Sequence, residues 1–259
     1  MNKSTIYKGY GIEYANGKIC APEFGMIPEL LIDGNEKIGK GVYHFSTLPT
    51  NKDFSVTING KDYTVRGTCP CHCDGCYATK GNYNFSSVKK SLAIRTILAE
   101  RYPDFVYCAI MAQIEADGIE TIRIHASGDF FSLEYLNMWK DIIKKNPCVK
   151  FWTYTKRTDF ETAFDAFSNA NIVRSIVPNC GLNFGHCDYI LETIETLKKS
   201  GVVPFVCRCG IDKNQHCANC KGCLANRYVL FIEHSTDYKA ESDNAFPVLK
   251  SFIESQPNQ

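Results

Sequence analysis

Residues 67–77 read Gly67-Thr-Cys-Pro-Cys-His-Cys-Asp-Gly-Cys-Tyr77, and the rest of the chain is best understood outward from this stretch. Three of its four cysteines, Cys69, Cys73 and Cys76, have the spacing C-x3-C-x2-C. Thiols so close in sequence cannot all pair as unstrained disulfides, because each bridge needs a defined Cα separation and dihedral angle. They can converge on one metal centre instead. Three thiolates would leave one position of a four-iron cluster open, as catalytic metal sites do.

The composition favours metal chemistry over a disulfide scaffold. The 259 residues include 14 cysteines, and 29 basic against 28 acidic side chains give a formal net charge of +1. Residues 1–10 lack a secretory pattern, and no apolar run is long enough to span a bilayer. The sequence therefore predicts a cytoplasmic protein with no membrane contact, whose cysteines serve metal or redox chemistry. The balanced charge does not indicate binding to nucleic acid.

Strand signals precede the cysteine stretch. Ser55–Ile58 and Tyr63–Arg66 have β-branched alternation, and Asn59-Gly60 between them is a strong hairpin signal. Residues 39–46 suit a strand. Residues 1–38, punctuated by Gly, Pro and Asn, are expected to be irregular, with a possible short strand or turn around residues 28–32.

Helices and strands alternate after the cysteine stretch. The patterns predict helices over Ser86–Arg101, residues 103–116, Ser132–Lys145, Asp159–Ala170 and Asp188–Ser200, and strands over Ile119–His125, Val149–Thr155, Ile172–Val177, Val202–Val206 and Arg227–Ile232. Such alternation favours a parallel sheet with right-handed crossovers and a site at the carboxyl ends of its strands. We expect an α/β fold with a partial (β/α) barrel of mainly parallel strands, an N-terminal β-hairpin extension and a C-terminal cysteine-rich metal-binding segment. The expected divisions are residues 1–66, 67–206 and 207–259.

The cysteine stretch resembles the cluster loop of the radical S-adenosylmethionine (SAM) enzymes, because it follows a β-rich segment and precedes a helix. The resemblance implies that Cys69, Cys73 and Cys76 hold a [4Fe-4S] cluster whose fourth iron chelates SAM. Family members usually carry an aromatic residue just before the third cysteine, near the adenine. Here that position is Gly75, and the aromatic residue is Tyr77.

The wider chain is similar to a phage and mobile-element family known as the "gene product 88"-like domain, from about residue 39 to about residue 234. Neither resemblance identifies a substrate. The segments that carry this second resemblance are Gly39-Lys-Gly-Val-Tyr-His-Phe-Ser46, Cys76-Tyr-Ala-Thr-Lys-Gly81, His125-Ala-Ser-Gly-Asp-Phe130, Phe151-Trp-Thr-Tyr-Thr-Lys156 and the C-x2-C-x2-C run that ends at Cys223.

Several polar residues follow the predicted strands. The radical SAM resemblance implies that Ser127, Gly128 and Asp129 contact the SAM amino group, although Ser-Gly-Asp is also ordinary turn chemistry. The same resemblance implies that Lys156 and Ser175 contact the carboxylate and ribose of SAM. The alternative is that these two residues are simply exposed to solvent. His125 is a candidate catalytic residue, but a lone histidine is more often a satisfied core residue.

A second cysteine group lies near the C-terminus. Cys217, Cys220 and Cys223 resemble a ferredoxin run that needs a fourth ligand, which Cys207 or Cys209 could supply, and we favour Cys209. Four protein thiolates would close the site, so an auxiliary [4Fe-4S] cluster and zinc are equally compatible with this group.

Two functions remain open. The first is an iron–sulfur radical SAM-like enzyme that cleaves SAM reductively and abstracts hydrogen from an unknown substrate, with a flavodoxin or ferredoxin as reductant. The second is a zinc-stabilised, non-enzymatic phage or mobile-element protein that binds nucleic acid or a protein partner. In that alternative, Cys71 or His72 would complete a structural zinc site in the first cysteine stretch.

Overall fold

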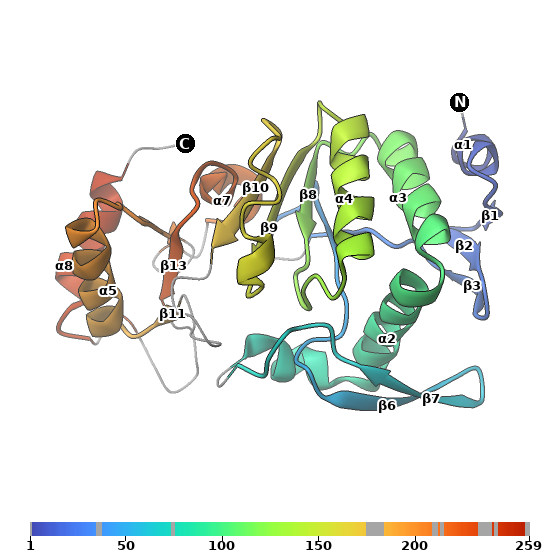
Figure 1. The fold of residues 1–259 in the computed structure, drawn as a ribbon, viewed down its shortest axis with the longest axis horizontal. Coiled ribbons are helices and arrows are strands. Elements are labelled where there is room, and N and C mark those ends of the chain that lie inside the picture. The colour runs from blue at the N-terminus through green and yellow to red at the C-terminus, as the bar shows by residue number, and fades with distance from the viewer. Residues whose placement is uncertain are drawn as a thin grey trace.

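The computed structural model describes residues 2–34, 38–73, 76–174, 184–208, 212, 215–232, 240 and 243–256. Its centre is a five-stranded sheet in the order β10-β9-β8-β5-β4 (Figure 1). The strands are β4 (Ile32–Asp33), β5 (Val42–Phe45), β8 (Thr121–Ile124), β9 (Lys150–Thr155) and β10 (Ala170–Arg174). Strands β5, β8, β9 and β10 are parallel and adjacent in chain order, whereas β4 pairs with β5 in the antiparallel sense.

Three helices share one apolar core with this sheet: α2 (Ser86–Arg101), α3 (Pro103–Asp117) and α4 (Leu133–Lys145). Local sequence sets their ends. The Ser132 hydroxyl caps α4 by accepting from the Tyr135 amide, and Gly118 ends α3 in the left-handed conformation. Alternate strand residues divide between the two faces, because side chains in a strand alternate. Phe151 and Ile172 pack under the helices, while Trp152 and Val173 face the other way.

The C-terminal cysteine segment covers the second face. Its two short helices are α6 (Cys217–Cys220) and α7 (Gly222–Ala225), and α7 lies beside β9 and β10 (Figure 1). Cys217 and Cys223 pack with Val42, Ala126 and Trp152 in this second apolar layer.

A smaller core follows the central sheet. Strands β12 (Phe205–Val206) and β11 (Phe184–Gly185) both pair in parallel with β13 (Val229–Ile232). Helices α5 (Cys187–Lys199) and α8 (Phe246–Ser255) supply its apolar side chains, among them Ile190, Ile194, Leu249 and Ile253. No helix in the described parts of the chain is long and apolar enough to cross a membrane.

The expectation of a partial barrel was wrong. The fold is mixed α/β, with one open mixed sheet and several smaller sheets. The parallel series stops at β10, because the later strands β11 and β12 pair with β13 rather than extending the central sheet. At the opposite edge, β4 runs antiparallel and ends the series there. The expected divisions of the chain stay a prediction.

The N-terminal region was wrongly expected to be irregular. It forms α1 (Lys3–Gly9) and a three-stranded antiparallel sheet of β1 (Tyr14–Ala15), β2 (Lys18–Ala21) and β3 (Gly25–Pro28). The turn between β1 and β2 is Asn16-Gly17, with positive φ at both residues. The predicted hairpin is confirmed as β6 (Asp53–Ile58) and β7 (Lys61–Arg66), joined by Asn59-Gly60 with the same backbone.

The helix expected over residues 159–170 was also wrong. Only the 3-10 helix η3 (Thr158–Phe160) forms there, followed by successive turns. The turns are closed by short-range bonds such as Ala163 N to Phe160 O and Phe167 N to Phe164 O. Phe160 and Phe164 are both buried and both pack against Phe130, so tertiary packing fixes the segment in this tighter form.

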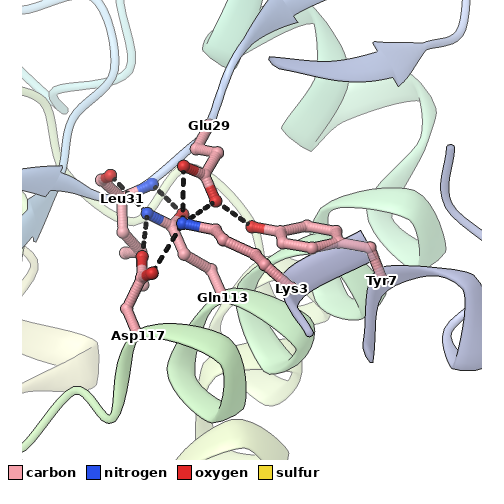
Figure 2. Close-up of polar contacts among 6 residues, drawn as sticks. All are labelled: Lys3, Tyr7, Glu29, Leu31, Gln113 and Asp117. Atoms are coloured by element: carbon pink, nitrogen blue, oxygen red, sulfur yellow. Dashed lines mark hydrogen bonds and ion pairs between the residues drawn. The ribbon is translucent and has the colours of Figure 1, made fainter. Parts of the chain in front are cut away.

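A polar brace fastens the N-terminal helix to α3 (Figure 2). The Lys3 ammonium lies 2.8 Å from a Glu29 carboxylate oxygen and 2.5 Å from Asp117, and Tyr7 donates to Glu29 at 2.5 Å. Gln113 completes it by bonding both the amide and the carbonyl of Leu31 at 2.8 Å. Burial opposes the charge on Lys3, but the bonds to Asp117 and Glu29 outweigh it and raise the pKa of Lys3.

Candidate functional site

The carboxyl edge of the parallel strands is built on buried hydroxyl groups. Thr47 follows β5, and its hydroxyl lies 2.8 Å from that of Thr68, which follows the hairpin. The Asp129 amide donates to the Thr68 hydroxyl at 3.0 Å, and the Ser127 hydroxyl donates to the Thr47 carbonyl at 2.9 Å. These bonds join the end of β5, the start of the cysteine stretch and the loop after β8. Cys69 is therefore held directly beside a rigid support.

Gly128 is required by this support. Its φ is +84°, and a Cβ at this position would lie 1.9 Å from the Thr47 hydroxyl and 2.6 Å from that of Thr68. Only glycine satisfies both the backbone and the space. The SAM contact expected for Gly128 stays a prediction, since the glycine has a structural reason of its own.

Asp129 is buried and accepts several hydrogen bonds. Its Oδ1 accepts from the Phe130 amide and the Thr155 hydroxyl, and its Oδ2 accepts from the Lys156 amide, each at 2.7 Å. Burial raises the pKa of Asp129 to about 6, against the lowering effect of these bonds. The carboxylate joins the loop after β8 to the end of β9. Its predicted contact with the SAM amino group would have to share these oxygens.

The three cysteines of the first stretch lie together at this edge. Burial, followed by the charges of Asp129, Cys76 and Cys73, raises the pKa of the Cys69 thiol. Cys71, between them, is disulfide-bonded and so does not compete as a thiolate. The thiols influence one another electrostatically, yet no group of three or more His, Cys, Asp or Glu side chains in the described ranges is placed to hold a metal ion. Thiols are suitable ligands for a metal cluster, but the described side chains do not converge as a metal-binding group.

Lys156 brings a cation to the thiols. Burial lowers its pKa, while Cys73, Asp129, Cys69 and Cys76 oppose this shift. The end of β9 thus places positive charge within electrostatic range of all three cysteines, as expected if the edge accommodates several thiolates.

Two tyrosines stand over the other side of the cysteine stretch. Tyr77 is 55% exposed and donates a hydrogen bond to the Ala126 carbonyl. Its ring meets that of Tyr83 edge-on with centroids 6.0 Å apart. Ser127, which was expected to contact SAM, is buried beside Tyr83 and already bonds Thr47.

His125 lies in the core rather than at the cysteine edge. Its Nε2 is 2.9 Å from the Tyr135 hydroxyl, and its ring packs on Phe130 and Tyr135. Burial, followed by the charge of Arg123, lowers its pKa to about 3. A neutral, packed imidazole matches the core interpretation. Its φ of +63° is unusual for a residue other than glycine.

The second cysteine group gathers beneath β9 and β10. Cys207, Cys220 and Cys223 pack with Val173 and Phe205, and the Tyr154 hydroxyl lies 2.8 Å from the Cys223 sulfur. The favoured fourth ligand, Cys209, lies outside the described residues, as does Ser175.

Sequence reasoning missed the roles of Arg123 and Tyr154, which lie between the two cysteine groups. Arg123 of β8 donates to the Tyr77 hydroxyl at 3.2 Å, and its guanidinium carbon lies 4.9 Å from the centroid of the Tyr154 ring. The signal was available: Arg123 interrupts an otherwise apolar alternation in Thr-Ile-Arg-Ile, on the face opposite Ile122 and Ile124.

Comparisons with known proteins identify relatives but no activity. A family model described as "Gene product 88" matches residues 29–221, which is more than half of the chain. A curated relative, "Gene 88 protein" of Mycobacterium phage L5, is 30% identical over 131 residues, covering 42% of this chain. The alignment covers 53% of the relative, so the chain spans about half the length of that protein. No solved structure shows significant similarity.

Proposed function

The chain belongs to the gene product 88 family, and we propose that within this family its cysteine edge binds a [4Fe-4S] cluster through Cys69, Cys73 and Cys76. The observation that carries the proposal is the meeting of these thiols with Lys156 and Asp129, which come from different strand ends. Carboxyl ends of adjacent parallel strands are where α/β proteins build their sites.

The protein residues would position and shield the ligands. Cys69 is anchored by its amide, which donates to the Thr50 carbonyl at 2.9 Å, and Cys69, Cys73 and Cys76 are all partly exposed. Lys156 offsets thiolate charge, and Tyr77 offers an exposed ring beside the third cysteine. When bound, such a cluster would supply an electron for reductive cleavage of SAM and so for hydrogen abstraction from a substrate. A flavodoxin or ferredoxin in the cytoplasm would be the reductant.

A second candidate is a zinc-stabilised, non-enzymatic phage protein that binds nucleic acid or a protein partner. The comparisons favour this candidate over the enzyme, because the relatives are described only as phage gene products. The geometry of the strand ends is the observation that keeps the enzyme first.

The second cysteine group would hold an auxiliary centre, either [4Fe-4S] or zinc. Cys217, Cys220 and Cys223 would be ligands in both cases. Cys207 packs with Cys220 and Cys223, which makes it a fourth ligand to test beside Cys209.

Metal analysis of protein purified without air separates the two candidates. The enzyme predicts iron and sulfide, with formation of 5′-deoxyadenosine after reconstitution and addition of SAM and a strong reductant. Cys73→Ser should lose this iron and this product, whereas Cys148→Ser, at an exposed free cysteine, should lose neither. Zinc without iron would favour the second candidate. Full iron loading without cleavage of SAM would reject the enzyme and retain the cluster.

A further inference from the structure

Arg123 is a cation whose contacts with the described residues are all neutral or thiol groups. Its Nε donates to the His125 carbonyl at 3.3 Å, and one terminal nitrogen donates to the Tyr77 hydroxyl at 3.2 Å. The guanidinium also lies over the Tyr154 ring. Burial opposes its charge, and the largest opposing influences, which raise the pKa of Arg123, come from Tyr77, Tyr154, Cys217 and Tyr83. No carboxylate is among these contacts.

Other arginines of the described chain have carboxylate partners or several hydrogen-bond acceptors. Those with carboxylate partners are Arg66 with Asp53, Arg101 with Glu23, Arg157 with Asp159, and both Arg174 and Arg227 with Asp165. Arg95 is fully enclosed and has no carboxylate, but it bonds the carbonyls of Leu30, Ser91 and Glu29 and the Ser91 hydroxyl. Arg123 makes two hydrogen bonds, although a guanidinium carries five N–H donors.

Within the described ranges, no carboxylate side chain contacts Arg123. His44 and His125 lie near enough for Arg123 to contribute, after burial, to the lowering of their pKa values, to about 4 and about 3. Both imidazoles are therefore neutral at pH 7. Asp129, the buried carboxylate of the cysteine edge, is engaged by the Thr155 hydroxyl and by backbone amides. A half-buried cation without a counter-charge is unfavourable unless a ligand supplies one.

We propose that Arg123, framed by Tyr77 and Tyr154, binds a carboxylate or phosphate group of the ligand that enters the cysteine edge. Guanidinium groups recognise these oxyanions through paired N–H donors. The bond between Arg123 and Tyr77 is exposed to solvent, so the site can be reached without opening the core. The inference adds an anionic substrate class to the proposed function. Its assignment of that anion as a substrate rests on the proposed function, whereas binding of the anion does not.

Matched small acids test the site directly. Benzoate and phenyl phosphate present the two oxyanions, and benzamide presents the same ring without charge. Isothermal titration of the full chain should give measurable affinity for at least one acid and none for benzamide, and the tighter acid identifies the group. Arg123→Gln should weaken that acid at least tenfold, about 1.4 kcal/mol, with Arg123→Lys in between. Arg66→Gln, which removes an exposed arginine already paired with Asp53, should leave the affinity unchanged.

Two results would overturn the inference: equal affinity of the wild type and Arg123→Gln, or benzamide binding as tightly as benzoate. If Arg123→Gln does not fold, Arg123→Lys and Tyr77→Phe carry the test, since both keep the packing. The same titration on Cys73→Ser separates this inference from the metal proposal. Acid binding that persists after loss of the metal would support the anion site while the cofactor proposal is judged by its own assay.

Discussion

Lys3 and Arg123 both lie beside tyrosines, and they differ in what surrounds them. Lys3 lies between the carboxylates of Glu29 and Asp117, and the Tyr7 hydroxyl donates into the same group (Figure 2). Arg123 lies between Tyr77 and Tyr154, and no carboxylate of the described residues contacts it. In the first arrangement, the chain itself supplies the counter-charges of the lysine. The second has no carboxylate counterpart among the described residues, which is why we propose that a bound anion supplies one.

The comparison distinguishes polar groups that are paired with one another and stabilise the fold from polar groups that can still bind a ligand. The brace links α1, the segment after β3, and α3. The cysteine edge has equally well-bonded support in Thr47, Thr68 and Asp129, but the groups above that support are exposed or lack a counter-charge. Four measurements would sharpen or break this distinction.

The largest effect is expected at Gly128, which tests whether the support of the cysteine edge is as rigid as the brace. Gly128→Ala would place a methyl group 1.9 Å from the Thr47 hydroxyl at a φ of +84°. We expect a loss of about 3 kcal/mol or more in the free energy of unfolding, measured with urea. Gly118→Ala is the control, because φ there is +60° but nothing lies within 4 Å. Equal losses in the two variants would mean that the threonine contacts are dispensable.

The next effect concerns the brace itself. Glu29→Gln removes the charge that Lys3 and Tyr7 share, and we expect a loss of about 2 kcal/mol in unfolding free energy, less than for a fully buried pair because Lys3 is partly exposed. Lys3→Met combined with Glu29→Gln should cost less than the sum of the single changes. Additive losses would show that Lys3 and Glu29 do not form a coupled unit.

The third measurement is the dependence of stability on pH. His44 and His125 have pKa values lowered in the fold, so the unfolded chain takes up protons more readily. The contribution of these two histidines to stability should therefore be complete above about pH 6.5 and fall as the pH approaches 4. The raised pKa of Asp129 acts in the opposite sense below about pH 6, and this contribution is common to the wild type and to Arg123→Gln. Because Arg123 contributes to both shifts, Arg123→Gln should reduce the fall between pH 7 and pH 4.5 by roughly 1 kcal/mol. Parallel urea-midpoint profiles for the two proteins would contradict an uncompensated charge at Arg123.

The smallest effect is expected from Arg123→Gln at neutral pH. Loss of two hydrogen bonds and a ring contact is offset by relief of a charge without a partner. The unfolding free energy should change by less than about 0.5 kcal/mol. A loss comparable with that of Glu29→Gln would make Arg123 a second brace and remove the contrast between the two regions.

Local signals predicted much of the secondary structure. Asn59-Gly60 marked its hairpin, Ser132 and Gly118 marked helix ends, and the alternating strands β8 and β9 lie where expected. The same Asn-Gly signal at residues 16–17 was overlooked, and with it the N-terminal sheet. That error was avoidable, because the hairpin rule applied equally there.

Other features depend on contacts that the sequence does not reveal. Periodicity alone could not tell a helix over residues 159–170 from turns held by Phe160 and Phe164. The closing of a barrel depends on strand pairing, and β11 and β12 pair with β13 rather than with the central sheet. Spacing singled out the cysteines, but the polar support of Thr47 and Thr68 and the isolated charge of Arg123 arise from residues distant in sequence.

The contact at Gly39 has a consequence for the order in which the protein matures. A Cβ there would lie 2.5 Å from His216 Nδ1 and 2.8 Å from the Ala218 Cβ, so the last cysteine segment settles against the loop just before the first parallel strand. During synthesis, that loop and its strand leave the ribosome long before residues 216–224. Until those residues arrive, Trp152 and Val42 have no cover. A nascent chain stalled before residue 216 should therefore remain dependent on a chaperone, even with its central strands complete.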